Sequence, residues 1–222
     1  MSSLSNRYRK ASDLPKSIPI FPLSGALLLP RTDLPLNIFE PRYLLMVEEA
    51  MQSDRIIGII QPRENDVAEV PALETIGCAG RITSYSETDD GRLVITITGV
   101  CRFMLKKELI TKTPYRMATV DYKLFAVDLV SESGALNVNR DQLIMAFRQY
   151  LEANNMSADW NEVNSVSTEV LVNTLSLFAP YPPREKQALL EAPDLKSRAD
   201  VLVALTEMAL SKSGSGKTQR LQ

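Results

Sequence analysis

The spacing of the apolar residues changes near the middle of this 222-residue chain, and this change constrains the fold more than any other feature. Up to residue 125 the apolar residues form short runs, rich in β-branched side chains and separated by turn residues, as in strands. From residue 140 they recur every three or four positions, as in amphipathic helices. The sequence therefore predicts an α+β protein in which the strands precede most of the helices.

Seven short strands are expected in the first half of the chain. Two prolines within 18–23, Pro19 and Pro22, predict an edge strand, because proline donates no hydrogen bond to a neighbour. Asp89, Asp90 and Gly91 supply a turn, where glycine can take a positive φ. The expected strands are 18–23, 34–39, 56–60, 77–85, 93–98, 100–105 and 115–125. This many short strands predicts a small barrel or sandwich.

One helix is expected among the strands and several more after them. Pro41 fits the first position of a helix, where its missing N–H is not needed. Leu44, Val47 and Met51 follow it at helical spacing. Later helices are expected at 141–153, at 167–179, through residues 189–190, and from 194 onward. We interpret their apolar stripes as core, with a binding groove as the alternative.

These patterns divide the chain into five segments. They are a flexible N-terminus (1–16), a β domain (17–126), a polar linker (127–139), a helical bundle (140–211) and a disordered polar tail (212–222).

Composition limits the chemistry available to the chain. It has no histidine, which excludes a Ser-His-Asp triad, a Cys-His pair and histidine-ligated zinc. Cys78 and Cys101 both lie in apolar runs, so we expect buried, reduced thiols. Two cysteines make neither a disulfide framework nor a four-thiolate metal site. No catalytic residue, metal or cofactor is expected.

Charge and hydropathy narrow the partners and the location. The net charge of -2 and the pI near 5.4 argue against nucleic acid as the main partner. No run of about 18 apolar residues occurs, so we expect no membrane span. The polar start is not followed by an apolar segment, as a signal peptide requires. We therefore expect a cytoplasmic protein.

Two kinds of motif imitate functional sites. The segment from Ser211 to Thr218 nearly spells a phosphate-binding P-loop, but no glycine starts it and too little chain follows for a helix. We interpret it as a tail, not a nucleotide site. The carboxylate pairs Glu48–Glu49 and Asp89–Asp90 fit solvated charge better than acid–base catalysis.

Ten positions, 34–43, contain a strand, a proline-started helix and an arginine between aromatic residues. In a structural interpretation, Phe39 staples the helix entry while Arg42 and Tyr43 hold the helix to the β domain. In a functional interpretation, the three residues form a recognition edge, because aromatic residues and arginine anchor many interfaces. The structural interpretation is favoured, and Phe39, Arg42 and Tyr43 remain the candidate binding residues.

Several motifs, in this order, resemble the Lon protease N-terminal domain family. They are IPIFPL (18–23), LPLNIFEPRY (34–43), GCAGRI (77–82), GVCRF (99–103) and EKQALLE (185–191). The resemblance covers about residues 16–210. It implies a PUA-like β-barrel followed by a helical bundle, and a role in substrate binding. It also suggests a stand-alone member without the ATPase and peptidase domains of Lon, and so not a protease.

The resulting hypothesis is a non-catalytic module that binds unfolded or extended protein segments, such as an adaptor in protein quality control. One alternative is a dedicated structural subunit of a single fixed complex. Another is a small enzyme or ligand-binding protein that uses chemistry without histidine. RNA binding rests on fold analogy alone and conflicts with the acidic pI. The oligomeric state stays open.

Overall fold

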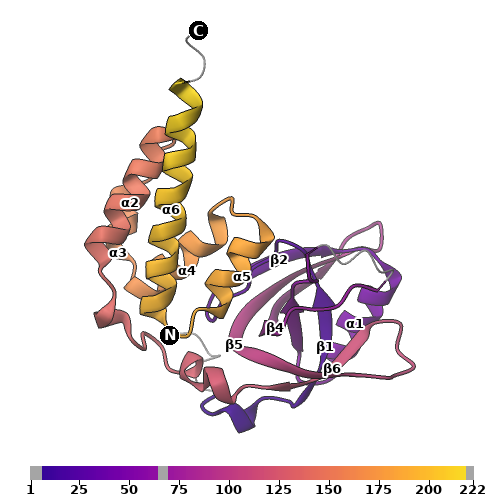
Figure 1. Ribbon diagram of the computed structural model, residues 1–222. Coiled ribbons are helices and arrows are strands. Elements are labelled where there is room, and N and C mark those ends of the chain that lie inside the picture. Colours follow the sequence, from indigo (N-terminus) through magenta and orange to yellow (C-terminus); the bar gives the residue numbers. More distant parts are fainter. Residues whose placement is uncertain (1–6, 65–69, 219–222) are drawn as a thin grey trace. The chain divides into compact units, whose positions relative to one another are not determined.

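The computed structural model describes residues 7–64 and 70–218 and confirms the α+β class (Figure 1). The chain forms two compact units. The sheet unit comprises Met1–Ser131 together with Tyr181–Leu190, and the helical unit comprises Glu132–Pro180 together with Glu191–Gln222. The sheet unit is thus assembled from two separate stretches of chain.

The sheet unit is built on one six-stranded mixed sheet. Its strands are β1 (Ser17–Pro22), β2 (Asp33–Ile38), β3 (Ile56–Ile60), β4 (Ile76–Glu87), β5 (Leu93–Leu109) and β6 (Arg116–Asp121). Their order is β2-β5-β4-β3-β1-β6, and β5 pairs in addition with β6. Only β1 and β3 run parallel. The other pairings are antiparallel, as expected for strands joined by short connections.

The sheet curls on itself but is not the regular closed barrel that the resemblance implies. The first half of β5 pairs with β2, and its last residues, from Met104 to Leu109, pair with β6. Strand β2 is therefore left outside the curl, beside one half of β5. The runs 93–98 and 100–105, predicted as two strands, are one continuous strand.

Gly99 explains why the predicted break in β5 is absent. A Cβ atom at this position would lie 2.0 Å from the carbonyl oxygen of Leu29. Glycine is thus required because another backbone segment passes close by, and no turn occurs there.

Strand β1 lies inside the sheet, so the prediction of an edge strand is wrong. Its prolines are tolerated because β3 and β6 cover different parts of it. Pro19 pairs with Met117 of β6, outside the part of β1 that pairs with β3. Pro22 pairs with Ile60 of β3, beyond the part that pairs with β6. Each proline therefore has a strand neighbour on one side only.

Helix α1 (Pro41–Met51) contributes to the core of the sheet unit. Its buried residues are Tyr43, Met46, Val47 and Ala50, and they face the side chains of the sheet. The largest fully buried apolar side chains of the unit are Ile18, Ile20, Leu28, Leu29, Met46, Ile57, Ile60, Ile95, Ile97, Phe103 and Phe125. The apolar runs of the sequence thus form one continuous core.

Short 3-10 helices flank the sheet: η1 (Ala11–Asp13) before β1, and η2 (Lys123–Leu129) after β6. Strand β6 ends at Asp121, earlier than predicted, and the side chain of this residue accepts a hydrogen bond from the Lys123 N–H. Residues 1–6 of the predicted flexible N-terminus lie outside the described residues. Within the rest of that segment, Tyr8 and Leu14 are buried.

Helix α5 (Pro183–Glu191) is packed against the sheet by buried amide groups, although it lies late in the sequence. The Gln61 side chain donates to the carbonyl oxygen of Pro183 and to Gln187 Oε1, at 3.0 and 3.1 Å. In turn, Gln187 donates to the carbonyl oxygen of Ile76, and Lys186 Nζ donates to that of Gly25.

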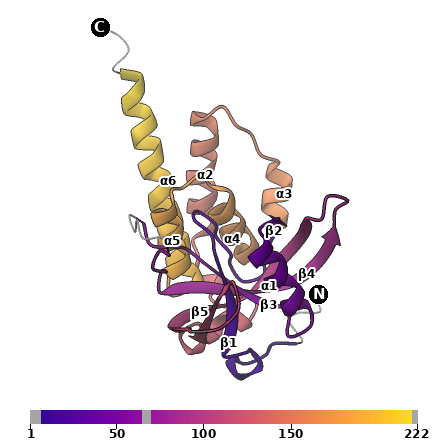
Figure 2. The same cartoon turned by 90° about the vertical axis from the view of Figure 1, so that its right-hand side faces the viewer.

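The helical unit comprises η3 (Ala135–Asn137), α2 (Arg140–Ala153), α3 (Trp160–Ser165), α4 (Thr168–Phe178) and α6 (Leu195–Thr218). Helices α2 and α6 run side by side (Figures 1 and 2). The caps Asn139, Asp159 and Ser167 start α2, α3 and α4 by accepting backbone hydrogen bonds.

Helix α6 extends to Thr218, into the segment predicted as a disordered tail, and residues 219–222 lie outside the described residues.

Candidate functional site

The candidate site lies where β2 passes into α1. Strand β2 ends at Ile38, and Glu40 is the residue before the first turn of the helix, with extended φ and ψ of -71° and 130°. Pro41 follows at the start of α1, as predicted. The chain therefore turns within two residues, which places Phe39 on the connection itself.

Tyr43 forms the buried base of the site. Its side chain packs on Phe21 of β1, with ring centroids 4.2 Å apart and ring planes inclined by 37°. Burial raises the pKa of the Tyr43 hydroxyl, and the positive charge of Arg42 opposes part of this increase. This side chain thus joins α1 to the sheet, as the structural interpretation expects.

Arg42 lies above this base and is held in place on two sides. Its guanidinium carbon is 4.5 Å from the centre of the Tyr43 ring, a cation–π contact. Its Nε and Nη2 atoms lie 2.9 and 2.8 Å from Glu40 Oε2. The Arg42 side chain remains 52% exposed. Glu40 and the Tyr43 ring therefore orient a guanidinium group that is still accessible to solvent.

Phe39 does not staple the helix, because its side chain is 63% exposed. Two further apolar side chains that sequence reasoning missed are exposed near this connection. Leu45 lies on α1 and is 36% exposed, and Val94 of β5, the partner of Asn37 in β2, is 43% exposed. The predicted stripe of Leu44, Val47 and Met51 shares only Val47 with the buried face of α1, so its phase was wrong and could not identify Leu45 as exposed. We name Phe39, Arg42 and Leu45 the Phe39 edge.

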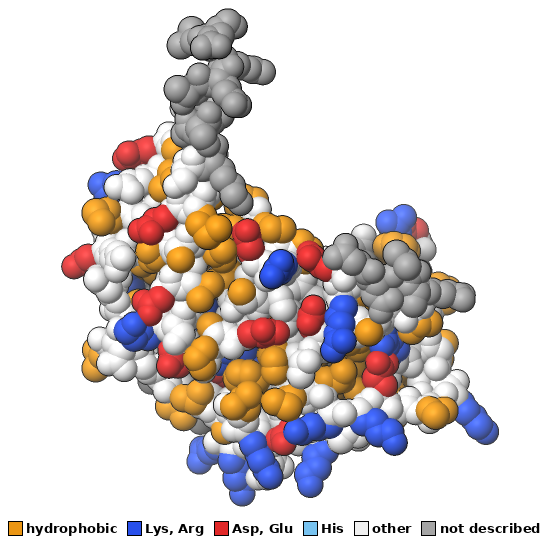
Figure 3. Space-filling model, viewed as in Figure 1, with side chains coloured by type: hydrophobic (Ala, Val, Ile, Leu, Met, Phe, Trp, Pro, Cys, Tyr) orange, Lys and Arg blue, Asp and Glu red, His pale blue; other side chains and the backbone are white. Residues whose placement is uncertain are grey.

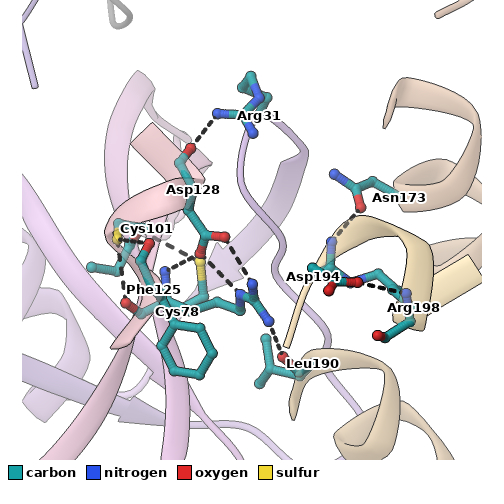
Figure 4. A network of polar contacts seen from close by, with 12 residues as sticks. Arg31, Cys78, Cys101, Phe125, Asp128, Asn173, Leu190, Asp194 and Arg198 are labelled. Carbon is teal, nitrogen blue, oxygen red and sulfur yellow. Dashed lines mark hydrogen bonds and ion pairs between the residues drawn. The ribbon is translucent and has the colours of Figure 1, made fainter. Parts of the chain in front are cut away.

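A second cluster, of buried polar groups, lies within the sheet unit (Figure 4). The Arg102 guanidinium donates to both carboxylate oxygens of Asp128 and to the carbonyl oxygen of Leu190. It also lies 4.2 Å from the centre of the Phe125 ring. Arg31 donates to the carbonyl oxygen of Asp128 at 2.6 Å. Because the carboxylate is fully engaged, we interpret this cluster as structural.

Neither Cys78 nor Cys101 forms a disulfide in the described part of the chain, and both are buried, as expected. The Cys101 thiol donates to the carbonyl oxygen of Phe125 at 3.3 Å, and burial raises its pKa. Such a thiol is a poor nucleophile at neutral pH. Among residues 7–64 and 70–218, no group of three or more His, Cys, Asp or Glu side chains could hold a metal ion.

The remaining motifs also have local roles in the structure. The backbone of Ser211–Thr218 belongs to α6, whereas a P-loop is a loop that precedes a helix. Asp90 accepts a hydrogen bond from Thr88, which lowers the pKa of its carboxyl group. Glu49 accepts a hydrogen bond from the Tyr115 hydroxyl. No helix within the described ranges is long and apolar enough to cross a membrane.

The solved structures that share this fold include two Lon N-terminal domains. One is the Lon N-terminal domain protein of Xanthomonas campestris, with a TM-score of 0.62 and 20% identity. The other is the N-terminal domain of the Lon protease of the Mycobacterium avium complex, with a TM-score of 0.63 and 21% identity. Each comparison covers 86% of this chain and 98% of the solved one. The fold is therefore that of a Lon N-terminal domain.

The family described as "ATP-dependent protease La (LON) substrate-binding domain" matches residues 17–207, and this chain belongs to it. Curated relatives include Lon protease 2 of Myxococcus xanthus, 27% identical over 209 residues, and the Lon protease of Anaeromyxobacter dehalogenans, 23% identical over 207 residues. Both matches cover 87% of this chain. The chain spans only about a quarter of the length of these relatives, 24% and 23%.

Proposed function

We propose that this protein is a non-catalytic recognition module of the cytoplasm that binds exposed apolar or extended segments of other proteins. An adaptor role in protein quality control would use such an activity. The proposal includes neither nucleic acid nor a membrane as a partner. The observation that supports it best is the Phe39 edge, on a domain whose family is described as substrate-binding.

The geometry of the Phe39 edge suits weak, sequence-tolerant binding. Phe39 offers an exposed aromatic ring, which gains free energy when a partner covers it. Arg42 is held over Tyr43 and can donate to carbonyl groups of an extended segment. Because Tyr43 is buried against Phe21, the arginine is oriented before a partner arrives, which reduces the entropy lost on binding.

A binding measurement tests this proposal directly. The probe is a reduced, carbamidomethylated and fluorescently labelled model protein, which stays unfolded without added negative charge, and its anisotropy is followed as the full chain is added. We expect dissociation constants of tens of micromolar, about -6 kcal/mol. The substitution Phe39→Ser should weaken binding at least about fivefold, because it removes the largest exposed apolar group of the edge.

Ile110→Ser is the matched control, since Ile110 is fully exposed elsewhere in the sheet unit. It should leave the dissociation constant unchanged. Absence of binding at tens of micromolar (about -6 kcal/mol), or equal losses in the two variants, would refute the proposal.

Affinity capture separates this function from a dedicated subunit of one complex. With the full chain as bait, many sub-stoichiometric and aggregation-prone proteins are expected in the eluate of a cell lysate. A single stoichiometric companion would instead favour the fixed-complex alternative. The same capture with Phe39→Ser should lose the heterogeneous set if the Phe39 edge makes the contacts.

A further inference from the structure

Lysine and arginine side chains from distant parts of the sequence gather at one margin of the sheet unit. Strand β6 pairs with β1 and β5 at the same residue, because Thr119 lies opposite both Ser17 and Lys107. Lys16 precedes Ser17, and its carbonyl oxygen accepts from the Val120 N–H. Lys16 and Lys107 therefore flank β6.

The 3-10 helices extend this group of cations. Helix η1 contacts η2, so Arg9 and Lys10, just before η1, lie in the same part of the sheet unit as Lys123, the first residue of η2. Figure 3 shows lysine and arginine side chains along the lower margin of the view, where Figure 1 has β6 and the turns beside it. The basic surface comprises Arg9, Lys10, Lys16, Lys106, Lys107 and Lys123, and all six residues are exposed.

Few carboxylates balance these cations. Asp13 is occupied by the backbone N–H groups of Arg9 and Lys10, which lowers its pKa. Asp121 lies 3.8 Å from Lys106 Nζ and also accepts from a backbone N–H. Glu108, next to Lys107, is engaged by Arg116. The six cations thus outnumber the carboxylates that contact them, in a chain whose net charge is -2. The surface has a local positive potential that attracts negatively charged groups.

The apolar groups beside the basic surface indicate the class of partner. Leu124 and Val127 of η2 are 62% and 42% exposed, whereas the aromatic residues Tyr122 and Phe125 are buried. Proteins that bind single-stranded nucleic acid usually offer aromatic rings for base stacking, and these rings are not accessible here. Aliphatic side chains next to lysines instead suit a protein segment that combines acidic and aliphatic residues.

The two carboxylates argue against a lipid surface. A bilayer presents a continuous layer of anionic headgroups, which would bring negative charge against Asp13 and Asp121 as well as against the lysines. A peptide can place an uncharged residue or a hydrogen-bond donor at those points. Lysine also suits an acidic peptide, because its ammonium group sits on a flexible stem and can pair with carboxylates in many orientations.

We propose that the basic surface is a docking site for acidic, aliphatic-containing segments of other proteins, separate from the Phe39 edge. It would select partners by charge, whereas the Phe39 edge would bind exposed apolar chain. The proposal stands on the arrangement of β1, β5, β6, η1 and η2, and it does not require the Phe39 edge to function.

The experiment uses the full chain and a labelled peptide in which Asp and Glu alternate with Leu. A matched peptide carries Asn and Gln in place of the acids. Anisotropy should show binding of the acidic peptide only, and affinity should fall at least about fivefold between about 50 and about 300 mM salt. The triple variant Lys16→Gln, Lys107→Gln, Lys123→Gln should weaken binding about tenfold or more.

The control variant Arg63→Gln, Arg92→Gln, Lys196→Gln changes the net charge by the same amount at exposed positions outside the basic surface. It should retain most of the affinity. Equal losses in the two triple variants would overturn the proposal, as would tighter binding to oligouridylate or to phosphatidylserine vesicles than to the acidic peptide.

The Phe39→Ser variant should bind the acidic peptide normally, and the lysine triple variant should still bind the carbamidomethylated protein. The two proposals can therefore fail independently.

Discussion

Arg102 and Asp128 form a bidentate ion pair inside the sheet unit, with Nη2–Oδ1 and Nε–Oδ2 distances of 2.8 and 2.9 Å. The two side chains are 1% and 7% exposed. Through this pair and the bond from Arg102 to the carbonyl oxygen of Leu190, strand β5 is tied to both η2 and α5. A single side chain thus joins segments that lie 26 and 88 residues away in sequence.

The first prediction concerns this pair. Asp128→Ala leaves a buried guanidinium without its counter-ion, and we expect the free energy of unfolding of the sheet unit to fall by about 3–5 kcal/mol. Hydrogen exchange of the β5 amides measures this loss. The control Asp90→Ala removes the partner of Arg92 in an ion pair whose side chains are more than half exposed. It should cost far less, because solvent screens this pair. Similar losses would show that the buried pair has no special role.

The second prediction concerns the attachment of α5. Gln187→Leu removes the acceptor for Gln61 and the donor to the carbonyl oxygen of Ile76. Because these groups are buried, we expect a loss of about 1–3 kcal/mol and faster proteolysis within residues 181–190. Arg184→Ala, at an exposed position of the same helix, should change stability by less than about 0.5 kcal/mol. Unchanged proteolysis of Gln187→Leu would contradict this view of how α5 is held.

The third prediction concerns the close backbone approach at Gly99. In Gly99→Ala the new methyl group meets the carbonyl oxygen of Leu29, a backbone atom that no rotamer change can move. We expect a loss of about 3 kcal/mol or more in urea unfolding. Gly91→Ala meets no atom within 4 Å but has a φ of +76°, so it should cost only about 1–2 kcal/mol. The reverse order of the two losses would refute the argument.

The fourth prediction concerns alkaline pH. Burial and then the hydrogen bond to Glu49 raise the pKa of Tyr115 from 10.0 to about 12. The unfolded state therefore loses this proton at lower pH than the folded state. The stabilising contribution is complete below pH 10 and declines as the pH rises toward 12.

Urea unfolding at several pH values measures this decline. Tyr115→Phe should be less stable than the wild type at neutral pH and should show a shallower loss of stability in this alkaline range. An unchanged slope would assign the effect to other groups.

The fifth prediction concerns the thiols. Because Cys78 and Cys101 are buried thiols outside any disulfide, Ellman's reagent should react with neither in the native protein and with both in denaturant, without prior reduction. Rapid reaction of the native protein would show that the sheet opens around β4 and β5. Absence of reaction in denaturant would instead indicate a disulfide.

Local patterns in the sequence predicted most of the elements but not how they assemble. The proline at the start of α1 was visible, because its effect is confined to the first turn of the helix. Helix α3 was missed, since its six residues are too few to show an apolar period. The runs 93–98 and 100–105 were predicted as two strands, and the Leu29 segment that explains the glycine between them lies 70 residues earlier in the sequence.

In the candidate site, too, local contacts could be predicted from the sequence but the packing of distant segments could not. Sequence proximity correctly brought Arg42 and Tyr43 together, because neighbouring residues of one helix turn can stack. The exposure of Phe39 could not be predicted, since it depends on whether other segments cover it. The basic surface was equally inaccessible to sequence reasoning. Its lysines come from separate segments, and only the pairing of β6 with both β1 and β5 brings them together.

The discontinuity of the sheet unit has a consequence for synthesis of the protein. The ribosome makes the six strands within the first 121 residues, but α5 and the carbonyl oxygen of Leu190 arrive only about 70 residues later. During that interval Arg102 and Gln61 lack part of their hydrogen bonding, and the nascent sheet unit is incomplete. A truncated product that stops at residue 131 would remain in this state permanently. Chaperones and proteases would therefore meet this chain as a client before it is complete.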